Sequence, residues 1–76
     1  MFAIDIEFKD GTRFEGLIYT WRPEKGWVEV MDETAGERNT VWLSEVRSGS
    51  VYSDRIRKNA RAEDLLEKAK REGYGK

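Results

Sequence analysis

The chain has 76 residues with 14 Lys and Arg against 15 Asp and Glu, a net charge of −1, and neither His nor Cys. This length fits one domain with a small core that we expect to depend on its aromatic residues, and the composition excludes disulfides, thiol chemistry, imidazole bases and the usual zinc sites. With no signal peptide and no apolar stretch long enough to span a bilayer, we expect a cytoplasmic protein without membrane association.

The first part of the chain predicts a strongly bent β-hairpin. Residues 2–8 alternate apolar with small or charged residues, which is the period of a half-buried strand. The pair Asp10-Gly11 predicts a tight turn because it supplies the positive backbone angles that such a turn needs. The return strand, over 12–22, contains Gly16, which suits a bend or bulge by which a short sheet curls onto itself.

Three further strands are expected in the middle of the chain. A turn over 22–26, with proline early and glycine last, precedes a third strand over 27–31 whose two valines face one side. A polar loop over 32–39 leads to a short fourth strand over 40–43. Residues 43–46 predict a tight turn of 3₁₀ type, and a fifth strand is then expected from about Arg47 or Ser50 to Ile56.

A change of period near residue 59 predicts a C-terminal helix. Between residues 60 and 72 the apolar positions fall at helical spacing, with Asn59 as a suitable N-cap and Gly73 as a C-terminal cap. We therefore expect a β domain over 1–57, an amphipathic helix over 58–73 that packs on this domain or on a partner, and a frayed tail over 74–76.

The charges are divided unequally along the chain. Residues 1–46 hold five Lys and Arg against ten Asp and Glu, whereas residues 47–76 hold nine against five. The two parts therefore carry −5 and +4. Interleaved charges of this kind usually keep a short helix soluble, although a basic surface for an acidic partner is the alternative reading.

The side chains that most catalytic sites need are missing. Without His, the serines have no imidazole to activate them, and the adjacent acidic pairs Asp32-Glu33 and Glu63-Asp64 fit solvation or a helix dipole better than acid–base catalysis. No glycine-rich phosphate loop is present. The sequence predicts a binding protein that is not an enzyme and needs no cofactor.

The stretch 4–18 resembles the first motif of the Sm and Sm-like (LSm) proteins, with alternating apolar residues, Asp10-Gly11, Phe14 and Gly16 in matching order and spacing. The resemblance covers about a third of the chain and implies an all-β fold, a small, strongly bent five-stranded barrel, here followed by one C-terminal α-helix. A generic SH3-like barrel, with 43–46 as its 3₁₀ turn, accounts for the same residues. Sm-like proteins form rings, so the resemblance also implies a homo-oligomer.

Two hypotheses about binding follow from this barrel. In Sm-like barrels the turns at 22–27 and 47–49 share one rim, which would hold Arg22, Lys25, Trp27 and Arg47. Cations beside an indole suit RNA or a small nucleotide, because a base can stack on the ring while a phosphate meets the cations.

The alternative hypothesis is a protein–protein interaction or inhibitor module of SH3-like type. At least one of the three tryptophans is expected at the surface, because so small a core cannot hold them all, and exposed aromatics commonly anchor partner proteins. The residues expected to form this interface are Tyr19, Trp21, Trp42 and Tyr52, with Trp27 beside them. An acidic barrel half favours a basic partner.

Overall fold

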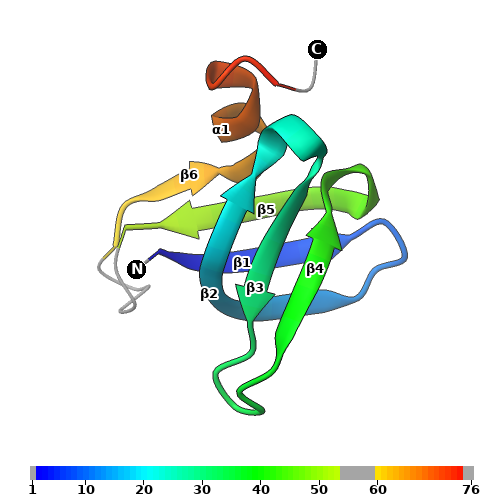
Figure 1. Cartoon of the computed structure of the whole chain (residues 1–76), viewed down its shortest axis with the longest axis vertical. Helices are drawn as coiled ribbons and strands as arrows, with labels where there is room; N and C mark the ends of the chain where they lie inside the picture. Colours follow the sequence, from blue (N-terminus) through cyan, green and yellow to red (C-terminus); the bar gives the residue numbers. More distant parts are fainter. Residues whose placement is uncertain (1, 54–59, 75–76) are drawn as a thin grey trace.

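The computed structural model describes residues 2–53 and 60–74, most of which form one antiparallel β-sheet (Figure 1). The order of the strands is β4-β3-β2-β1-β5-β6. Their bounds are Ala3–Phe8 (β1), Arg13–Arg22 (β2), Trp27–Met31 (β3), Arg38–Trp42 (β4), Val46–Tyr52 (β5) and Ala62–Asp64 (β6). Two 3₁₀ helices and one α-helix complete this part of the chain: Pro23–Lys25 (η1), Leu43–Glu45 (η2) and Leu65–Arg71 (α1).

The prediction of a small β domain with a C-terminal helix is confirmed, but the predicted five-stranded closed barrel is not. The sheet has six strands and stays open, with β4 at one edge and β6 at the other. The sixth strand arises because residues 62–64 pair with the outer side of β5, from Tyr52↔Ala62 to Ser50↔Asp64. Extra pairing at this edge extends the sheet, and no ladder joins β6 to β4.

The predicted hairpin between β1 and β2 is confirmed. Phe8 donates its N–H to Thr12 O at 2.8 Å, and Gly11 adopts a φ of 92° in the turn. The Asp10 carboxylate accepts hydrogen bonds from the Thr12 hydroxyl at 2.7 Å and the Thr12 N–H at 2.9 Å. These bonds, with the side-chain bond the largest contribution, lower the pKa of Asp10 below its ordinary value.

The bend predicted at Gly16 lies where β2 changes partners. The first half of β2 pairs with β1 and the second half with β3, and Leu17 pairs with both. A Cβ atom at Gly16 would collide with the Met31 carbonyl oxygen and would lie 2.8 Å from the Phe14 ring. The strand can turn at this point because glycine leaves room for both neighbours.

The core consists mainly of branched aliphatic residues, which corrects the expectation that it depends on aromatics. Val28 and Val30, which were predicted to share one side of their strand, face it, and both are fully buried. The aromatic rings of Phe8, Phe14 and Trp21 are only partly buried and pack around the margin. The buried cluster comprises Ile4, Ile6, Val28, Val30, Val41, Val46, Val51 and Leu65.

The C-terminal helix is shorter than the predicted 58–73. Residues 62–64 form β6, so α1 begins at Leu65, after Asp64 accepts the Glu67 N–H at 2.9 Å as the N-cap. Pairing of Ala62 with β5 replaces the helical turn that its spacing indicated. The predicted N-cap Asn59 and residue 58 lie outside the described residues, as do residues 54–56 of the predicted fifth strand.

The predicted glycine cap ends α1, and the chain continues in order beyond it. Gly73 has a φ of 93° and donates its N–H to Lys70 O, while Tyr74 donates its N–H to Ala69 O, both at 2.9 Å. These two bonds are those of a Schellman motif. Tyr74, which the sequence placed in a frayed tail, therefore closes the helix, and residues 75–76 lie outside the described part.

Candidate binding groove

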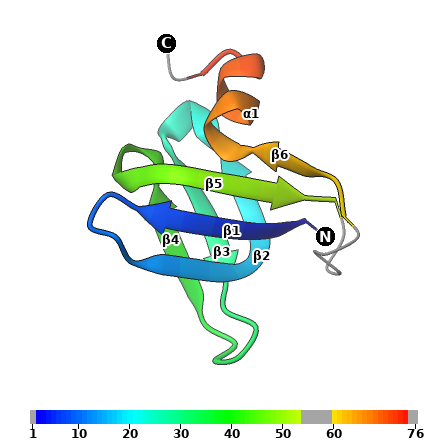
Figure 2. The same ribbon diagram turned by 180° about the vertical axis from the view of Figure 1, so that it is seen from behind.

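Three elements from distant parts of the chain meet at one end of the sheet. The turn between β2 and β3 (η1), the turn between β4 and β5 (η2) and α1 lie side by side there in both ribbon views (Figures 1 and 2). Leu43 donates its N–H to Gly26 O at 2.9 Å, which joins η2 to the end of the β2–β3 turn. Gly26 is left-handed, with a φ of 82°, and its N–H closes the turn on Pro23 O.

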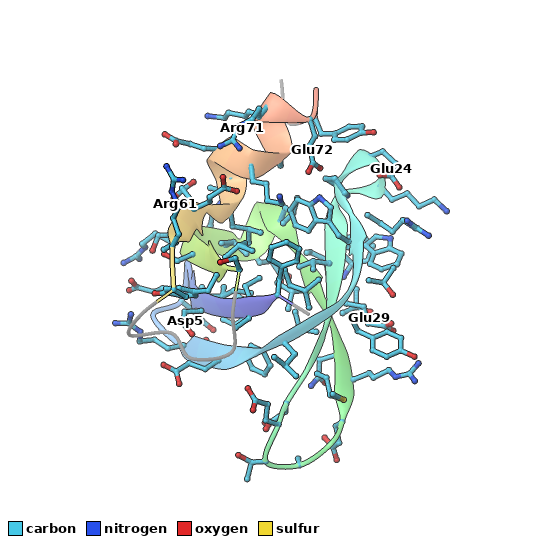
Figure 3. All side chains as sticks on the ribbon, turned by 90° about the vertical axis from the view of Figure 1, so that its left-hand side faces the viewer. Asp5, Glu24, Glu29, Arg61, Arg71 and Glu72 are labelled. Atoms are coloured by element: carbon cyan, nitrogen blue, oxygen red, sulfur yellow. The ribbon has the colours of Figure 1, made fainter. Side chains whose placement is uncertain are left out.

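Helix α1 is held against the rest of the fold by two buried residues, Leu65 and Ala69, and by a hydrogen bond to β2. Leu65 is fully buried in the core and packs against Gly49, where a Cβ atom would lie 3.4 Å from the Leu65 side chain and 3.2 Å from the Asp5 carbonyl oxygen. The Trp21 indole N–H donates to the Glu72 carboxylate at 2.6 Å. Figure 3 shows Glu72 near the end of β2, to which Trp21 belongs.

Charged pairs lie along α1, and two of them join it to β6. The Arg71 guanidinium donates to Glu63 at 3.1 Å, and Lys68 lies 3.8 Å from both Glu63 and Glu72. The hydrogen bond from Arg71 is the main reason that the pKa of Glu63 falls below its ordinary value. The side chains other than Lys68 are exposed, and such pairs contribute little stability each.

A groove of about 550 Å³ runs between η1, η2 and α1. Its apolar wall consists of Pro23, Gly26, Trp42, Leu43, Leu66 and Ala69. Glu24, Ser44 and Lys70 complete the lining, so the site has few polar groups and one charge of each sign. Trp42 is 48% exposed, which makes its indole available to an occupant.

A second depression lies beside η2, on the side of the β1–β2 turn. It has a volume of about 330 Å³ and is lined by Phe8, Lys9, Asp10, Ser44 and Glu45, and Ser44 belongs to both depressions. Lys9 donates its N–H to Glu45 O at 2.9 Å, which holds the two turns together. We call the two depressions together the η2 groove.

A second surface, which shares Trp42 with the groove, lies on the side of β2, β3 and β4 that faces away from the core, and we call it the outer face. Register places Arg22, Trp27 and Trp42 next to one another across the three strands. At the other end of this face, the Arg38 guanidinium lies 3.7 Å from the centre of the Tyr19 ring, and Tyr19 is 46% exposed. Glu29 projects from the middle of the outer face (Figure 3).

The structure separates the four residues of the predicted nucleotide rim. Arg22, Lys25 and Trp27 share the β2–β3 turn, where Arg22 lies 4.0 Å from Glu24. Arg47 lies against the β1–β2 hairpin instead, because its guanidinium donates to Lys9 O at 2.9 Å and lies 3.7 Å from Glu7. The residues of the predicted rim therefore occupy two places, three of them at the β2–β3 turn and Arg47 at the β1–β2 hairpin.

The four residues of the predicted aromatic interface are also distributed over different surfaces. Tyr19 and Trp42 are exposed, which confirms that at least one tryptophan reaches the surface. Trp21 packs against the core cluster, and Tyr52 lines a polar depression with Ser48, Ser50 and Asp64. Trp42 is the member of the set that lines the η2 groove.

Several groove residues had no role in the sequence-based hypotheses. Pro23, Leu43 and Leu66 belong to a turn, a 3₁₀ helix and an α-helix that are far apart in the chain. The sequence contained one signal for Leu66. It belongs to the apolar stripe of the helix, but it is not one of the two buried residues of α1, Leu65 and Ala69. A narrow stripe with one member left at the surface indicates a second contact surface.

No protein-family model, no curated protein and no solved structure matches the chain. Among the helices of residues 2–53 and 60–74, none has the length and apolar character that crossing a membrane requires.

Proposed function

We propose that this domain is a non-catalytic interaction module that binds an extended, mainly apolar segment of a partner protein in the η2 groove. The observation that carries the proposal is the apolar lining of a groove of about 550 Å³ beside an indole that is 48% exposed. A tryptophan that is exposed in the free protein and loses its contact with water in the complex is a frequent anchor of protein interfaces. The proposal follows the SH3-like alternative rather than the Sm-like one.

The position of the groove supports an extended occupant. It passes over η2, between the turn that joins β1 to β2 and the turn that joins β2 to β3, and so it is longer than one side chain needs. A segment in polyproline II conformation presents flat apolar surfaces and loses little conformational entropy when it binds aromatic-lined grooves. Trp42 and Pro23 offer matching flat surfaces.

Charge supports a basic residue at the flank of that segment. Residues 1–46, which supply most of the groove, hold ten Asp and Glu against five Lys and Arg. Along the groove, Glu24, Glu45 and Asp10 outnumber Lys9 and Lys70. Such an excess of acidic groups favours association with a cationic segment and favours one orientation of that segment in the groove.

Blocking the groove at Ser44 tests the proposal. Ser44 is exposed and common to both depressions, so Ser44→Arg fills the groove without touching the core. Selection of phage-displayed random dodecapeptides on the wild-type domain should enrich apolar sequences with a basic residue. Calorimetry with a selected synthetic peptide should show that Ser44→Arg weakens binding at least about tenfold, a loss of about 1.4 kcal/mol.

Ser48→Arg is the matched control, because Ser48 is an equally exposed serine on β5 outside the groove. This control should bind the peptide within about twofold of wild type, as expected for a surface change away from the contact. Failure to enrich any sequence would overturn the proposal. Equal binding by the two variants would place the peptide elsewhere.

A second candidate function is binding of single-stranded RNA at the outer face. The observation in its favour is the row of Arg22, Trp27 and Trp42, with Lys25 in the adjoining turn, which sets cations beside indoles. Bases stack on such rings while the cations meet phosphates. Glu29 in the middle of the same face and the acidic first half of the chain count against it.

The division of the predicted rim provides a test of RNA binding. Hexauridylate binding, measured by fluorescence anisotropy at about 50 mM salt, should weaken several-fold in Lys25→Ala and fall steeply with added salt. Arg47→Ala should bind like wild type, because Arg47 lies against the β1–β2 hairpin. Absence of binding at this salt concentration removes the RNA hypothesis, and equal losses in both variants would restore the single rim.

A further inference from the structure

The two edges of the open sheet differ in a way that points to different roles. β6 is three residues long and carries Glu63 and Asp64, and Glu63 is held by Arg71. A short, charged edge of this kind is a common protection against pairing with other chains. β4 is five residues long, contains no proline and carries a single charge, on Arg38.

The backbone groups of β4 that face the open side can be assigned from its ladder with β3. At one end Leu43 donates its N–H to Gly26 O, and at the other Glu37 O accepts the Asp32 N–H. Since the direction of backbone groups alternates along an antiparallel strand, every second residue from 37 to 43 bonds toward β3. The N–H and C=O groups of Arg38, Thr40 and Trp42 therefore point away from the sheet.

We propose that the β4 edge is a homodimer interface, in which β4 of a second copy of this chain pairs antiparallel to it about Thr40. This register places Thr40 opposite Thr40 of the second copy, and Arg38 opposite its Trp42. In this register each of the three residues lies opposite a residue of the second copy whose backbone N–H and C=O also point outward. Each such pair therefore exchanges two hydrogen bonds. The sheets of the two copies join into one.

The spacing of the outward groups on β4 suits a second copy of the chain as the occupant. The three outward residues are spaced evenly about Thr40, so a two-fold axis through that residue satisfies them all and closes the assembly as a dimer. The same axis sets each Arg38 opposite a tryptophan and never opposite the other arginine, which avoids like-charge repulsion across the strands. It also covers part of Trp42, which is 48% exposed in the single chain.

The side chains beside this edge favour association as well. Arg38, Thr40 and Trp42 all project onto the outer face, because they pair with Met31, Glu29 and Trp27 of β3. Pairing about Thr40 therefore brings the outer faces of two copies into one surface, with a ring of each copy beside an arginine stem of the other. An arginine side chain lying on an aromatic ring is a favourable contact. Trp42 also lines the η2 groove, so the dimer and a groove peptide share this side chain.

A proline at Thr40 tests the dimer. Because the Thr40 N–H points away from β3, Thr40→Pro removes an outward donor without removing a bond of the β3–β4 ladder, and proline is tolerated on edge strands. Thr40→Val keeps the N–H and suits a strand, so it is the matched control. Light scattering after gel filtration should give twice the 8.9 kDa chain mass for wild type and Thr40→Val, and the chain mass for Thr40→Pro.

Circular dichroism shows whether Thr40→Pro is folded, and hydrogen exchange of the wild-type protein keeps the test decisive if it is not. The amides of Arg38, Thr40 and Trp42 should be protected at high protein concentration and should lose protection on dilution, while those of β3 stay protected. A wild-type protein that is monomeric at every concentration overturns the proposal. So do a folded Thr40→Pro protein that remains dimeric and a wild-type assembly larger than a dimer, which would require pairing through other edges.

Discussion

Gly16→Ala is expected to lower the free energy of unfolding by about 3 kcal/mol, the upper end of the usual cost of overpacking a core. The added methyl group would collide with the Met31 carbonyl oxygen, and backbone at this point cannot move without breaking the pairing of β2 with β3. It would also press on the Phe14 ring, at 2.8 Å. Urea unfolding followed by tryptophan fluorescence measures the loss.

Glu15→Ala controls for a change of residue in the same strand. Glu15 is exposed and adjacent, so its replacement should alter the free energy of unfolding by no more than about 0.5 kcal/mol. If Gly16→Ala were as stable as this control, β2 would not bend at Gly16, and the description of how one long strand serves two halves of the sheet would be wrong.

Leu65→Ala is expected to cost about 3 kcal/mol, within the range found when a buried leucine is truncated. Leu65 is fully buried and is the residue of α1 that belongs to the core cluster. Its loss leaves a cavity against Gly49 and weakens the attachment of the helix. Thermal and urea unfolding report the loss of stability, and hydrogen exchange within α1 reports the attachment.

Leu66→Ala separates stability from binding at the neighbouring position. Leu66 is half-buried and lines the η2 groove, so its truncation should cost only about 1 kcal/mol of stability, the middle of the range for point substitutions. Binding of a groove peptide should weaken in this variant all the same. Equal destabilisation by the two truncations would contradict the assignment of Leu65 to the core and Leu66 to the groove.

Features of the fold that depend on neighbouring residues were predictable from the sequence. Asp10-Gly11 specified the first hairpin, since the turn needs only local hydrogen bonds and a positive φ at Gly11. The alternation in 27–31 gave the side of the sheet to which Val28 and Val30 belong. The 3₁₀ turn at 43–45 was also predicted, one residue shorter than its sequence range.

Features that depend on an edge of the sheet were not predictable in this way. The helical spacing of Ala62 with Leu65 and Leu66 indicated a longer helix, but the open side of β5 offers Ala62 backbone partners that a helix at this position lacks. Local propensity is a weak preference and yields to such pairing. The same competition decides that the sheet ends in β6 and stays open.

The candidate site was predictable only in part because its walls come from separate segments. The sequence singled out Trp42 but grouped it with Trp21, whose indole instead bonds to Glu72 some fifty residues later. Arg47 was assigned to a rim on the expectation that two turns lie together, whereas its guanidinium is held by the β1–β2 hairpin. Which turns adjoin depends on the curvature of the whole sheet, and residue spacing does not specify that.

Because α1 is short, the presence of the complete groove depends on an equilibrium between a docked and an undocked helix. A helix of seven residues is unstable on its own in water, so the wall formed by Leu66 and Ala69 exists only in the fraction of molecules in which the helix is docked. An occupant that touches this wall binds with an affinity reduced by that fraction, and by linkage its binding raises the docked population. Changes at Trp21 or Glu72, outside the groove, would therefore tune affinity through the opening of the C-terminal segment.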